Sequence, residues 1–382
     1  MAGGAHGSAG AGGRIRTPPG ADRAAPPHRP RPRAPALTAD SAHRRGLRPR
    51  DPGEPHRVAT PLELLFDLCF VVAVAQASAH LHHGLIEGRW GPAVLGYALV
   101  FFAIWWAWMN FTWFASAYGA DDTPYRLAVL VQIAGVLVLA AGVPRAFEQR
   151  DFHVVTAGYA VMRIGLVALW VRAARADVAG RGTAIRYAIG LIVVQLGWLA
   201  LLGLSAPRWL AGFVVLAPAE LLVPVWAERR HPTTWHPHHI AERFGLLTLI
   251  VLGESVLSAT TAIQAAVDGA ALTPALLAVV VGGVLVLFSM WWIYFDEPAH
   301  HLLGSSRTAF VWGYGHLVIF ASTAAVGAGL AAAADYAVGR SHLGGAATLA
   351  VVLVPLGLYL AGVWALVIHP LRRARRQRRP RP

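Results

Sequence analysis

A succession of long apolar stretches runs from about Thr60 to His369, and each is long enough to cross a lipid bilayer. A transmembrane helix needs about 20 mostly apolar residues, and stretches of that length recur about ten times here. Only short polar breaks separate them. The sequence therefore predicts an all-α, polytopic membrane protein, a transmembrane helical bundle of about ten spans.

The division into spans is clear except around Pro207, where one long hydrophobic stretch must be broken at residues 205–208. Arginine is concentrated in the loops that share a side with the N-terminus, so the positive-inside rule predicts that both termini lie in the cytoplasm. The predicted location is therefore the cytoplasmic membrane. We predict spans at residues 62–80, 93–116, 125–143, 153–172, 185–204, 209–227, 240–262, 274–295, 310–333 and 345–369.

The composition agrees with a bilayer as solvent, since 56% of residues are hydrophobic, only 14% are charged, and there are 14 Trp. The net charge of +13 lies in the two tails. Residues 1–57 hold eleven Arg and four acids, and residues 371–382 hold seven Arg and no acid. Basic tails on a hydrophobic body indicate topology signals and contacts with anionic lipids rather than nucleic-acid binding.

Three regions follow from this pattern. Residues 1–57 are rich in Gly, Ala, Pro and Arg, cannot bury enough apolar surface to offset ordering, and are predicted to be a disordered tail. Residues 58–370 form the transmembrane domain, and residues 371–382 form a basic cytoplasmic tail. A translation start at Val58 is an alternative that leaves the hydrophobic body intact. The single cysteine, Cys69, excludes a disulfide within the chain and is read as a small core residue.

A weak internal repeat is also present. The segment Phe102–Trp106 (FAIWW) resembles Phe288–Trp292 (FSMWW), and each is followed at the same offset by a polar residue, Asn110 or Asp296. The preceding spans match loosely as well. A parallel duplication, as in some transporters, and chance similarity between apolar segments both fit this pattern.

Three motifs carry a family resemblance. They are Thr60–Leu68 (TPLELLFDL), Ala120–Leu127 (ADDTPYRL) and Trp235–Leu246 (WHPHHIAERFGL), the last followed by the VLGES segment that ends at Ser255. The chain resembles the bacterial low temperature requirement protein A family of multi-pass membrane proteins. The resemblance implies a fold and a location but no reaction, and Leu65 and Cys69 depart mildly from the pattern. The motif residues of interest are Asp121, Asp122, Arg126, His236, His239, Glu242 and Arg243.

Intramembrane acids are costly unless they are used, which makes them candidates for an ion or proton pathway. Glu63 and Asp67 are four residues apart and share one face of the first span. Two carboxylates so close repel each other, so one of them is a candidate to hold a proton. Alternatively, Glu63 lies in the first helical turn and Asp67 pairs with a neighbouring arginine.

Glu254 lies past the middle of the seventh predicted span, and Ser258 follows one helical turn later on the same face. It is the leading candidate for a transported ion or proton. Arg163, near the middle of the fourth span, requires an acidic partner. Asp67, Glu220 and Glu254 are the options, and pairing of Glu254 with Arg163 is its structural alternative.

Histidines gather before the seventh span. His238 and His239 are expected to face Glu242 across one turn of helix, and this group is a weak candidate for zinc or for a pH sensor. The spacing matches no zinc signature, so a hydrogen-bonded structural collar is favoured and no metal is assigned. In the loop after the second span, Asp122 and Arg126 are expected to pair at i,i+4, as a helix cap or as a gate.

The leading hypothesis is an ion- or proton-coupled transporter or channel of unknown substrate. A membrane enzyme that uses the histidine cluster on a lipid-like substrate is the first alternative, and a membrane stress or sensory protein is the second. No nucleotide-binding loop, nucleophile elbow or dinucleotide motif is present in the sequence, so no cofactor is implied. The expected partners are the bilayer and a small molecule or ion, and an oligomer is possible.

Overall fold

The computed structural model describes residues 46–51, 54, 57–268 and 273–372. Within these ranges, ten helices are long and apolar enough to cross a membrane. They are α2 (Pro61–Ile86), α3 (Trp90–Ala117), α4 (Thr123–Glu148), α5 (His153–Ala176), α6 (Arg181–Leu201), α7 (Ala206–Glu228), α8 (Pro237–Asp268), α9 (Pro274–Phe295), α10 (Ser306–Ala337) and α11 (Gly345–Val363). A 3₁₀ helix (Ala299–Leu302) precedes α10, and a π-helical segment (Trp364–Ile368) continues α11.

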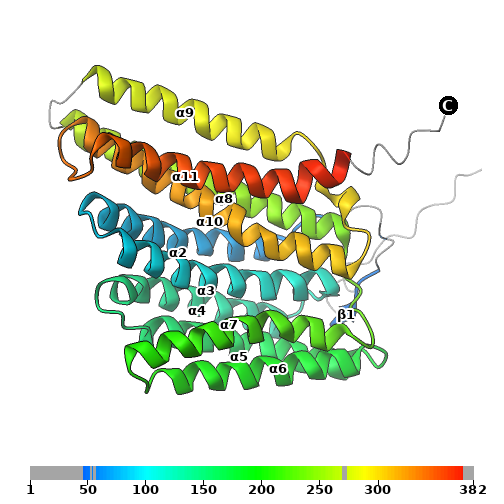
Figure 1. The fold of residues 1–382 in the computed structure, drawn as a ribbon. Coiled ribbons are helices and arrows are strands. Elements are labelled where there is room, and N and C mark those ends of the chain that lie inside the picture. Colours follow the sequence, from blue (N-terminus) through cyan, green and yellow to red (C-terminus); the bar gives the residue numbers. More distant parts are fainter. Residues whose placement is uncertain (1–45, 52–53, 55–56, 269–272, 373–382) are drawn as a thin grey trace, which may run out of the picture. The chain divides into compact units, whose positions relative to one another are not determined.

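The predicted all-α bundle of ten spans is confirmed, and most of the helices are longer than the predicted spans. The uncertain division near Pro207 lies slightly earlier than the predicted break at residues 205–208, because α6 ends at Leu201 and α7 already begins at Ala206. Figure 1 shows the helices lying side by side with their axes roughly aligned. The N-in, C-in orientation and the internal repeat stay predictions.

Capping residues fix where several helices start. Thr60 and Glu63 form a reciprocal capping box at the start of α2, each side chain bonding the other's backbone. The Asp122 side chain accepts from the backbone N–H of Tyr125 at the start of α4. Proline occupies the first turn of both helices, where its missing N–H has no helical partner to lose. The starts of α2 and α4 are thus marked in the sequence by a capping residue and a proline.

Small residues set how closely α4 and α5 pack. A Cβ atom added to Gly135 would lie 2.7 Å from the carbonyl oxygen of Gly158, so only glycine fits there. The helices differ in how many of their residues are buried. In the most hydrophobic stretch of each helix, the buried share is 78% in α10 and 61% in α3, but only 22% in α7, α9 and α11. The long, aromatic α3 therefore lies at the centre of the bundle, and α7 lies at its periphery.

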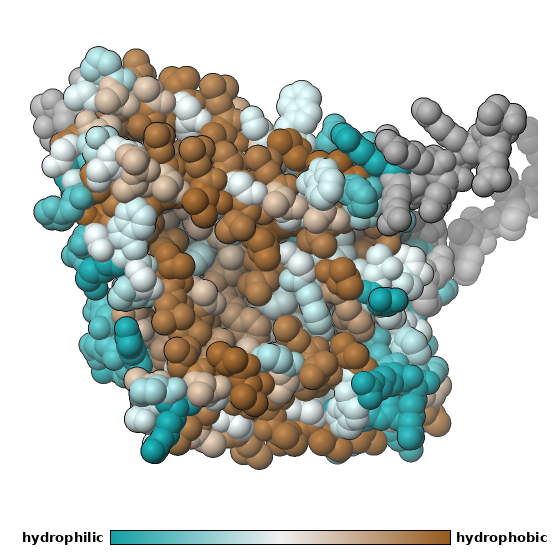
Figure 2. All heavy atoms as spheres, viewed as in Figure 1, coloured by the Kyte–Doolittle hydropathy of each residue, from teal (hydrophilic) through white to brown (hydrophobic). Residues whose placement is uncertain are grey.

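Apolar side chains also cover the outside of the bundle. Leu285, Phe288 and Trp292 on α9 are more than 60% exposed, as expected for a surface that faces lipid tails. On the face shown in Figure 2, hydrophobic residues extend over the middle of the helices and hydrophilic ones gather toward their two ends. We refer to these as the Arg57 end, where α2 begins, and the Arg150 end, where α4 is followed by α5.

The segment before α2 packs on the helices, which corrects part of the predicted disordered tail. Strand β1 (Arg48–Pro49) pairs antiparallel with β2 (Tyr118–Gly119), which follows α3. Leu47 is 4% exposed. Sequence reasoning counted only apolar bulk here and overlooked the backbone and arginine hydrogen bonds that this segment makes. The predictions for residues 1–45 and 373–382 lie outside the described residues.

Candidate functional site

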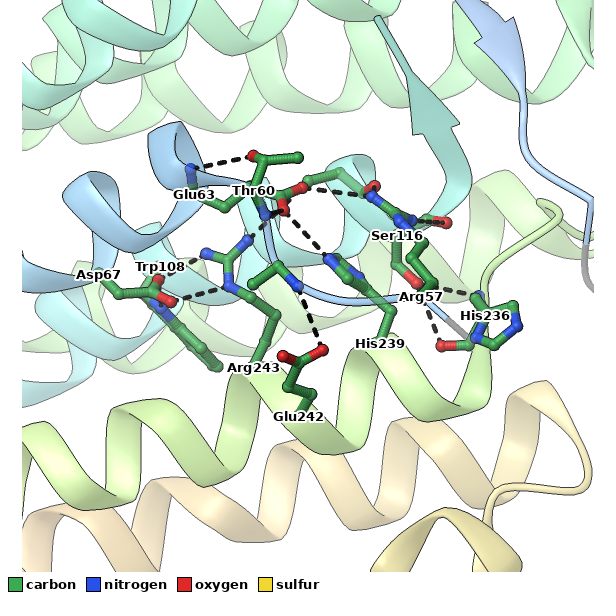
Figure 3. Close-up of polar contacts among 12 residues, drawn as sticks. Arg57, Thr60, Glu63, Asp67, Trp108, Ser116, His236, His239, Glu242 and Arg243 are labelled. Atoms are coloured by element: carbon green, nitrogen blue, oxygen red, sulfur yellow. Dashed lines mark hydrogen bonds and ion pairs between the residues drawn. The ribbon is translucent and has the colours of Figure 1, made fainter. Parts of the chain in front are cut away.

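The carboxylate of Asp67 on α2 is held by Arg243 on α8 in a bidentate pair. Arg243 Nη2 lies 2.5 Å from Oδ1 and Nε lies 2.8 Å from Oδ2. Trp108 Nε1 donates to Oδ1 at 2.7 Å, and both charged side chains are 0% exposed. The structure therefore shows the alternative in which Asp67 pairs with an arginine. Both oxygens of this carboxylate accept hydrogen bonds (Figure 3).

Glu63, one turn earlier on α2, is neutralised by a second arginine. Arg57 Nη2 lies 3.2 Å from Glu63 Oε1, and Arg243 Nη1 is 4.0 Å from the same atom. His239 Nε2 lies 3.3 Å from Oε2, which also accepts from the Thr60 N–H. The two acids thus face two arginines, and their mutual repulsion is offset by these cations rather than by a shared proton.

Arg57 lies in the segment that was predicted to be disordered, and sequence reasoning missed it. Its guanidinium donates to the carbonyl oxygens of Ala115 and Ser116 at 2.5 and 2.9 Å, where α3 ends. Burial lowers the pKa of Arg57 to about 10, and the charge of Glu63 acts in the opposite direction. The signal was its position six residues before Glu63, beside a capping box. We call Arg57, Glu63, Asp67, His239 and Arg243 the Arg57 network.

The remaining residues of the third motif complete this network. His236 Nε2 lies 2.7 Å from the Glu54 carbonyl oxygen, and Glu242 Oε2 accepts from the Ala59 N–H at 3.1 Å. α8 directs His239 at Glu63 on α2 and Glu242 at the Ala59 N–H before α2, and the expected facing of His238 and His239 toward Glu242 stays a prediction. His238 stacks on His300 with ring centroids 3.8 Å apart. Among the described residues, no group of three or more His, Cys, Asp or Glu could hold a metal ion.

The short loop after α3 differs from its prediction. Asp122 pairs with Arg172 of α5, at 2.7 Å, and Arg126 pairs with Asp121, so the expected Asp122–Arg126 pair does not form. Asp122 caps α4, which turns its carboxylate toward α5 rather than along its own helix. Burial acts to raise the pKa of Asp122, but the hydrogen bonds from Arg172 and the Tyr125 N–H lower it overall.

A second buried pair joins α5 and α7. Arg163 Nη2 lies 2.5 Å from Glu220 Oε2, and the two side chains are 6% and 0% exposed. Of the three partners considered for Arg163, the structure selects Glu220. Three aromatic side chains complete the group: Tyr159 Oη lies 2.8 Å from Arg163, Trp106 donates to Glu220 Oε2, and Trp198 donates to Oε1. We call Trp106, Tyr159, Arg163, Trp198 and Glu220 the Glu220 site.

Glu254 is separate from both groups. Its Oε1 accepts from Ser258, one turn along α8, at 2.7 Å. The expectation that it pairs with Arg163 is wrong. The preceding Gly253 does not mark a close helix approach, because a Cβ atom added there would meet nothing within 4 Å among the described residues. Asp67 and Glu254 therefore do not belong to one hydrogen-bonded pathway.

A cavity opens at the Arg150 end and leads toward the Glu220 site. It has a volume of about 470 Å³ and is lined by Arg150, Asp151, Phe152 and Trp209 among others. Phe152 and Trp209 also line a second, smaller cavity of about 40 Å³, whose wall includes Tyr159 and Trp198. We call the two cavities together the vestibule, and its inner wall includes two side chains that hydrogen-bond the Arg163–Glu220 pair, Tyr159 and Trp198.

Buried polar atoms without a partner are found in the Glu220 site and on α6 at about the same level in the bundle. Among the described residues, Arg163 Nη1 and both amide atoms of Gln195 are buried and have no hydrogen bond. Trp170 of α5 stacks on Tyr187 of α6 at 4.0 Å, and these helices run antiparallel, so Gln195 lies close to the level of Arg163. Sequence reasoning missed Gln195, because a glutamine in an apolar span carries no charge signal.

Comparison with known proteins gives one family. A family model described as the bacterial low temperature requirement A protein matches residues 58–381. An uncharacterized protein of Rhizobium meliloti (strain 1021) is 29% identical in an alignment of 278 residues, and the match covers 67% of this chain and 65% of that protein. The chain thus matches just under two thirds of that relative's length. No solved structure matches the chain.

Proposed function

The chain belongs to the bacterial low temperature requirement A family of membrane proteins, and we propose that it is a secondary carrier, coupled to ions or protons, that binds its substrate at the Glu220 site. The proposed location is the bacterial cytoplasmic membrane. With the predicted orientation, the Arg150 end faces outward and the Arg57 end faces the cytoplasm.

The observation that carries this proposal is the vestibule at the Arg150 end. Its mouth is lined by polar residues, and its inner wall contains Tyr159 and Trp198, which bond the buried Arg163–Glu220 pair. A carrier needs a polar site within the bundle that solvent reaches from one side at a time. Apolar surroundings and a few convergent polar groups are also typical of a small-molecule site.

The unpaired atoms of the Glu220 site indicate how a solute would bind. Arg163 Nη1 can donate to an anionic or carbonyl oxygen, and the Gln195 amide can both donate and accept. Both oxygens of Glu220 already accept hydrogen bonds from Trp198, Trp106 and Arg163. The solute therefore adds to the free face of Arg163 while Glu220 keeps the arginine oriented.

The Arg57 network closes the opposite end in this proposal. It ties the start of α2 to α3 and α8 through Arg57, Asp67 and Arg243, whose side chains are 0–4% exposed. Ion pairs that hold helices together at one end, while the other end is open, fit a carrier in one of its two access states. Opening toward the Arg57 end would require these pairs to separate.

Solid-supported membrane electrophysiology on proteoliposomes tests the proposal. Small organic anions, organic cations and zwitterions are applied in turn, and one class is expected to give transport currents. The Glu220→Gln variant should lose them. Asp335→Asn, which alters a partly buried carboxylate bonded to His82, is the matched control and should keep them. Wild-type currents in Glu220→Gln, or no current above protein-free liposomes for any class, would overturn the carrier.

Thiol labelling tests the vestibule independently. In a Cys69→Ser background, a membrane-impermeant maleimide should label Leu99→Cys, which lines both cavities. Ala73→Cys, at a fully buried position of α2, should stay unlabelled. Labelling of Leu99→Cys from outside intact cells would also test the predicted orientation. Equal labelling of both positions would argue against a vestibule confined to the Arg150 end.

A further inference from the structure

Glu228 is a second buried acid on α7, and sequence reasoning passed over it. It is the last residue of the helix and is followed by Arg229 and Arg230, which made it look like an ordinary exposed helix end. In the structure its side chain is buried at the Arg57 end, with the residue 6% exposed. It lies eight residues after Glu220, which is about 12 Å along the helix.

Three neutral groups donate to a single oxygen of this carboxyl group. Trp113 Nε1, Thr233 Oγ1 and Tyr187 Oη lie 2.7, 2.7 and 2.8 Å from Glu228 Oε1. The other oxygen, Oε2, is buried and has no hydrogen-bond partner in the part of the chain that the structure describes. The two oxygens are thus bonded unequally: three donors stabilise negative charge on Oε1, whereas Oε2 is buried without a donor among the described residues that would stabilise charge there.

No arginine neutralises this acid within the described ranges. Its neighbour Arg186 directs Nη1 to the carbonyl oxygen of Ala227 at 2.9 Å, and no ion pair within 4.0 Å includes Glu228. Three tyrosines interact with Glu228. The Tyr187 phenol donates a hydrogen bond to it, and Tyr118 and Tyr314 interact with it electrostatically. Burial raises the pKa of Tyr118, with Asp177 and then Glu228 adding to the effect, so this neighbour stays neutral.

We infer that Glu228 is a proton-binding site, with the proton on Oε2, and that it makes the proton the coupling ion of the proposed carrier. The role of Glu228 in coupling rests on the proposed function, whereas the binding of a proton by Glu228 does not. A buried carboxyl group without a cation is costly as an anion, and protonation removes that cost. A hard metal cation would need about six oxygen ligands, whereas the partners of Glu228 present hydrogen atoms, and Trp113 has no lone pair to offer.

The connection to the Glu220 site runs through α3 and α7. Trp106 bonds Glu220 and Trp113 bonds Glu228, and these tryptophans are seven residues apart on one face of α3. Pro224 lies between the two acids on α7 and removes the helical N–H that would bond the Glu220 carbonyl. A helix weakened at this point can bend when Glu228 changes charge, which alters the Trp106 contact with Glu220.

Infrared spectroscopy on the purified full-length protein tests proton binding without any transport. Difference spectra between acidic and alkaline buffers should show the C=O stretching band of a protonated carboxyl group, and Glu228→Gln should remove it. Gln carries an amide in place of the protonated acid, so the variant should fold with an unchanged melting temperature. Glu63→Gln is the control and should keep the band, because Glu63 is neutralised by arginines.

Two further outcomes separate this inference from the proposed function. In proteoliposomes, Glu228→Gln should still bind or exchange the solute but lose proton-driven accumulation, whereas Glu220→Gln should lose solute movement altogether. If no solute is moved but the band depends on Glu228, the carrier fails and the proton site stands. If Glu228→Gln leaves the band unchanged, or if sodium at constant pH removes it, the proton site is overturned while the carrier can stand.

Discussion

In the Arg57 network, two arginines face two carboxylates, whereas α7 carries two buried carboxylates, Glu220 and Glu228, of which only Glu220 pairs with an arginine, Arg163, within the described residues. In the first region both oxygens of Asp67 and of Glu63 accept hydrogen bonds. In the second, Arg163 Nη1, the Gln195 amide and Glu228 Oε2 have no partner among the described residues. Three nitrogens of the Arg57 network, Arg57 Nε, His239 Nδ1 and Arg243 Nη1, are also buried without a hydrogen bond in the described part of the chain, but each belongs to a side chain that faces Glu63, and no carboxylate oxygen there lacks a partner.

This difference separates two uses of charge in a membrane. A network in which the charges are balanced and every carboxylate oxygen accepts a hydrogen bond holds helices together. A site with unsatisfied donors and acceptors costs stability, and it persists where those atoms bind a solute, a proton or water. The following predictions test whether the Arg57 network is chiefly structural and the Glu220 site is chiefly functional.

The largest loss of stability is expected from Arg243→Met. It leaves Asp67 and Glu63 buried with one arginine fewer, and removing one partner of a buried pair costs about 3–5 kcal/mol. The melting temperature in detergent should fall steeply. Adding Asp67→Leu should recover part of the loss, because the uncompensated charge is then gone. A small change in Arg243→Met alone would mean that water reaches the Arg57 network.

A smaller loss is expected from Arg163→Gln, about 1–3 kcal/mol, because Glu220 keeps its hydrogen bonds from Trp106 and Trp198. Glu220→Gln in the same chain should restore much of the melting temperature. Transport should be absent in the single and the double variants alike. A double variant that is stable and still transports would place the substrate elsewhere.

Arg57→Met tests the segment that docks before α2, with an expected loss of about 1–2 kcal/mol. The variant removes the hydrogen bonds to the Ala115 and Ser116 carbonyl oxygens and the pair with Glu63. The matched control is Arg126→Met, whose arginine pairs with Asp121 at an exposed position. Equal melting temperatures for the two variants would show that the docked segment adds no stability.

Glu254→Gln should change stability by less than about 1 kcal/mol, since only a hydrogen bond from Ser258 is altered. Adding Arg163→Gln should not rescue it, because the two residues do not pair. Transport measured in the Glu254→Gln variant sharpens the comparison further. Loss of all currents here, with a folded protein, would return Glu254 to the pathway that the sequence suggested.

The smallest effect concerns pH at the histidine stack. Burial, and then the charges of His238 and His301, lower the pKa of His300 from its usual 6.5. Below pH 6.5 the unfolded chain therefore binds more protons than the folded one, and stability declines as the pH falls. His300→Gln should weaken this decline in melting temperature between neutral and mildly acidic pH. An unchanged decline in His300→Gln would show that the histidine stack does not contribute to the pH dependence.

Sequence reasoning reached part of the site. It selected Asp67, Glu63, Arg163 and Glu220 as buried charges, because a charged residue within an apolar span is visible in one dimension. It ranked Glu254 first for the same reason, although no arginine in the described structure faces it. It missed Gln195, which has no charge, and Glu228, which ends a helix beside two exposed arginines.

Length and hydropathy determined that this protein is a bundle of ten membrane-spanning helices, because bilayer thickness sets how many apolar residues a span needs. Capping residues and prolines fixed several helix starts for equally local reasons. Only the tertiary structure decided that Arg243 binds Asp67, that Arg163 binds Glu220, and that Glu228 pairs with none of the arginines in the described ranges. The pairing of buried charges depends on which helices are neighbours and how they are rotated, and no spacing within a single span specifies either.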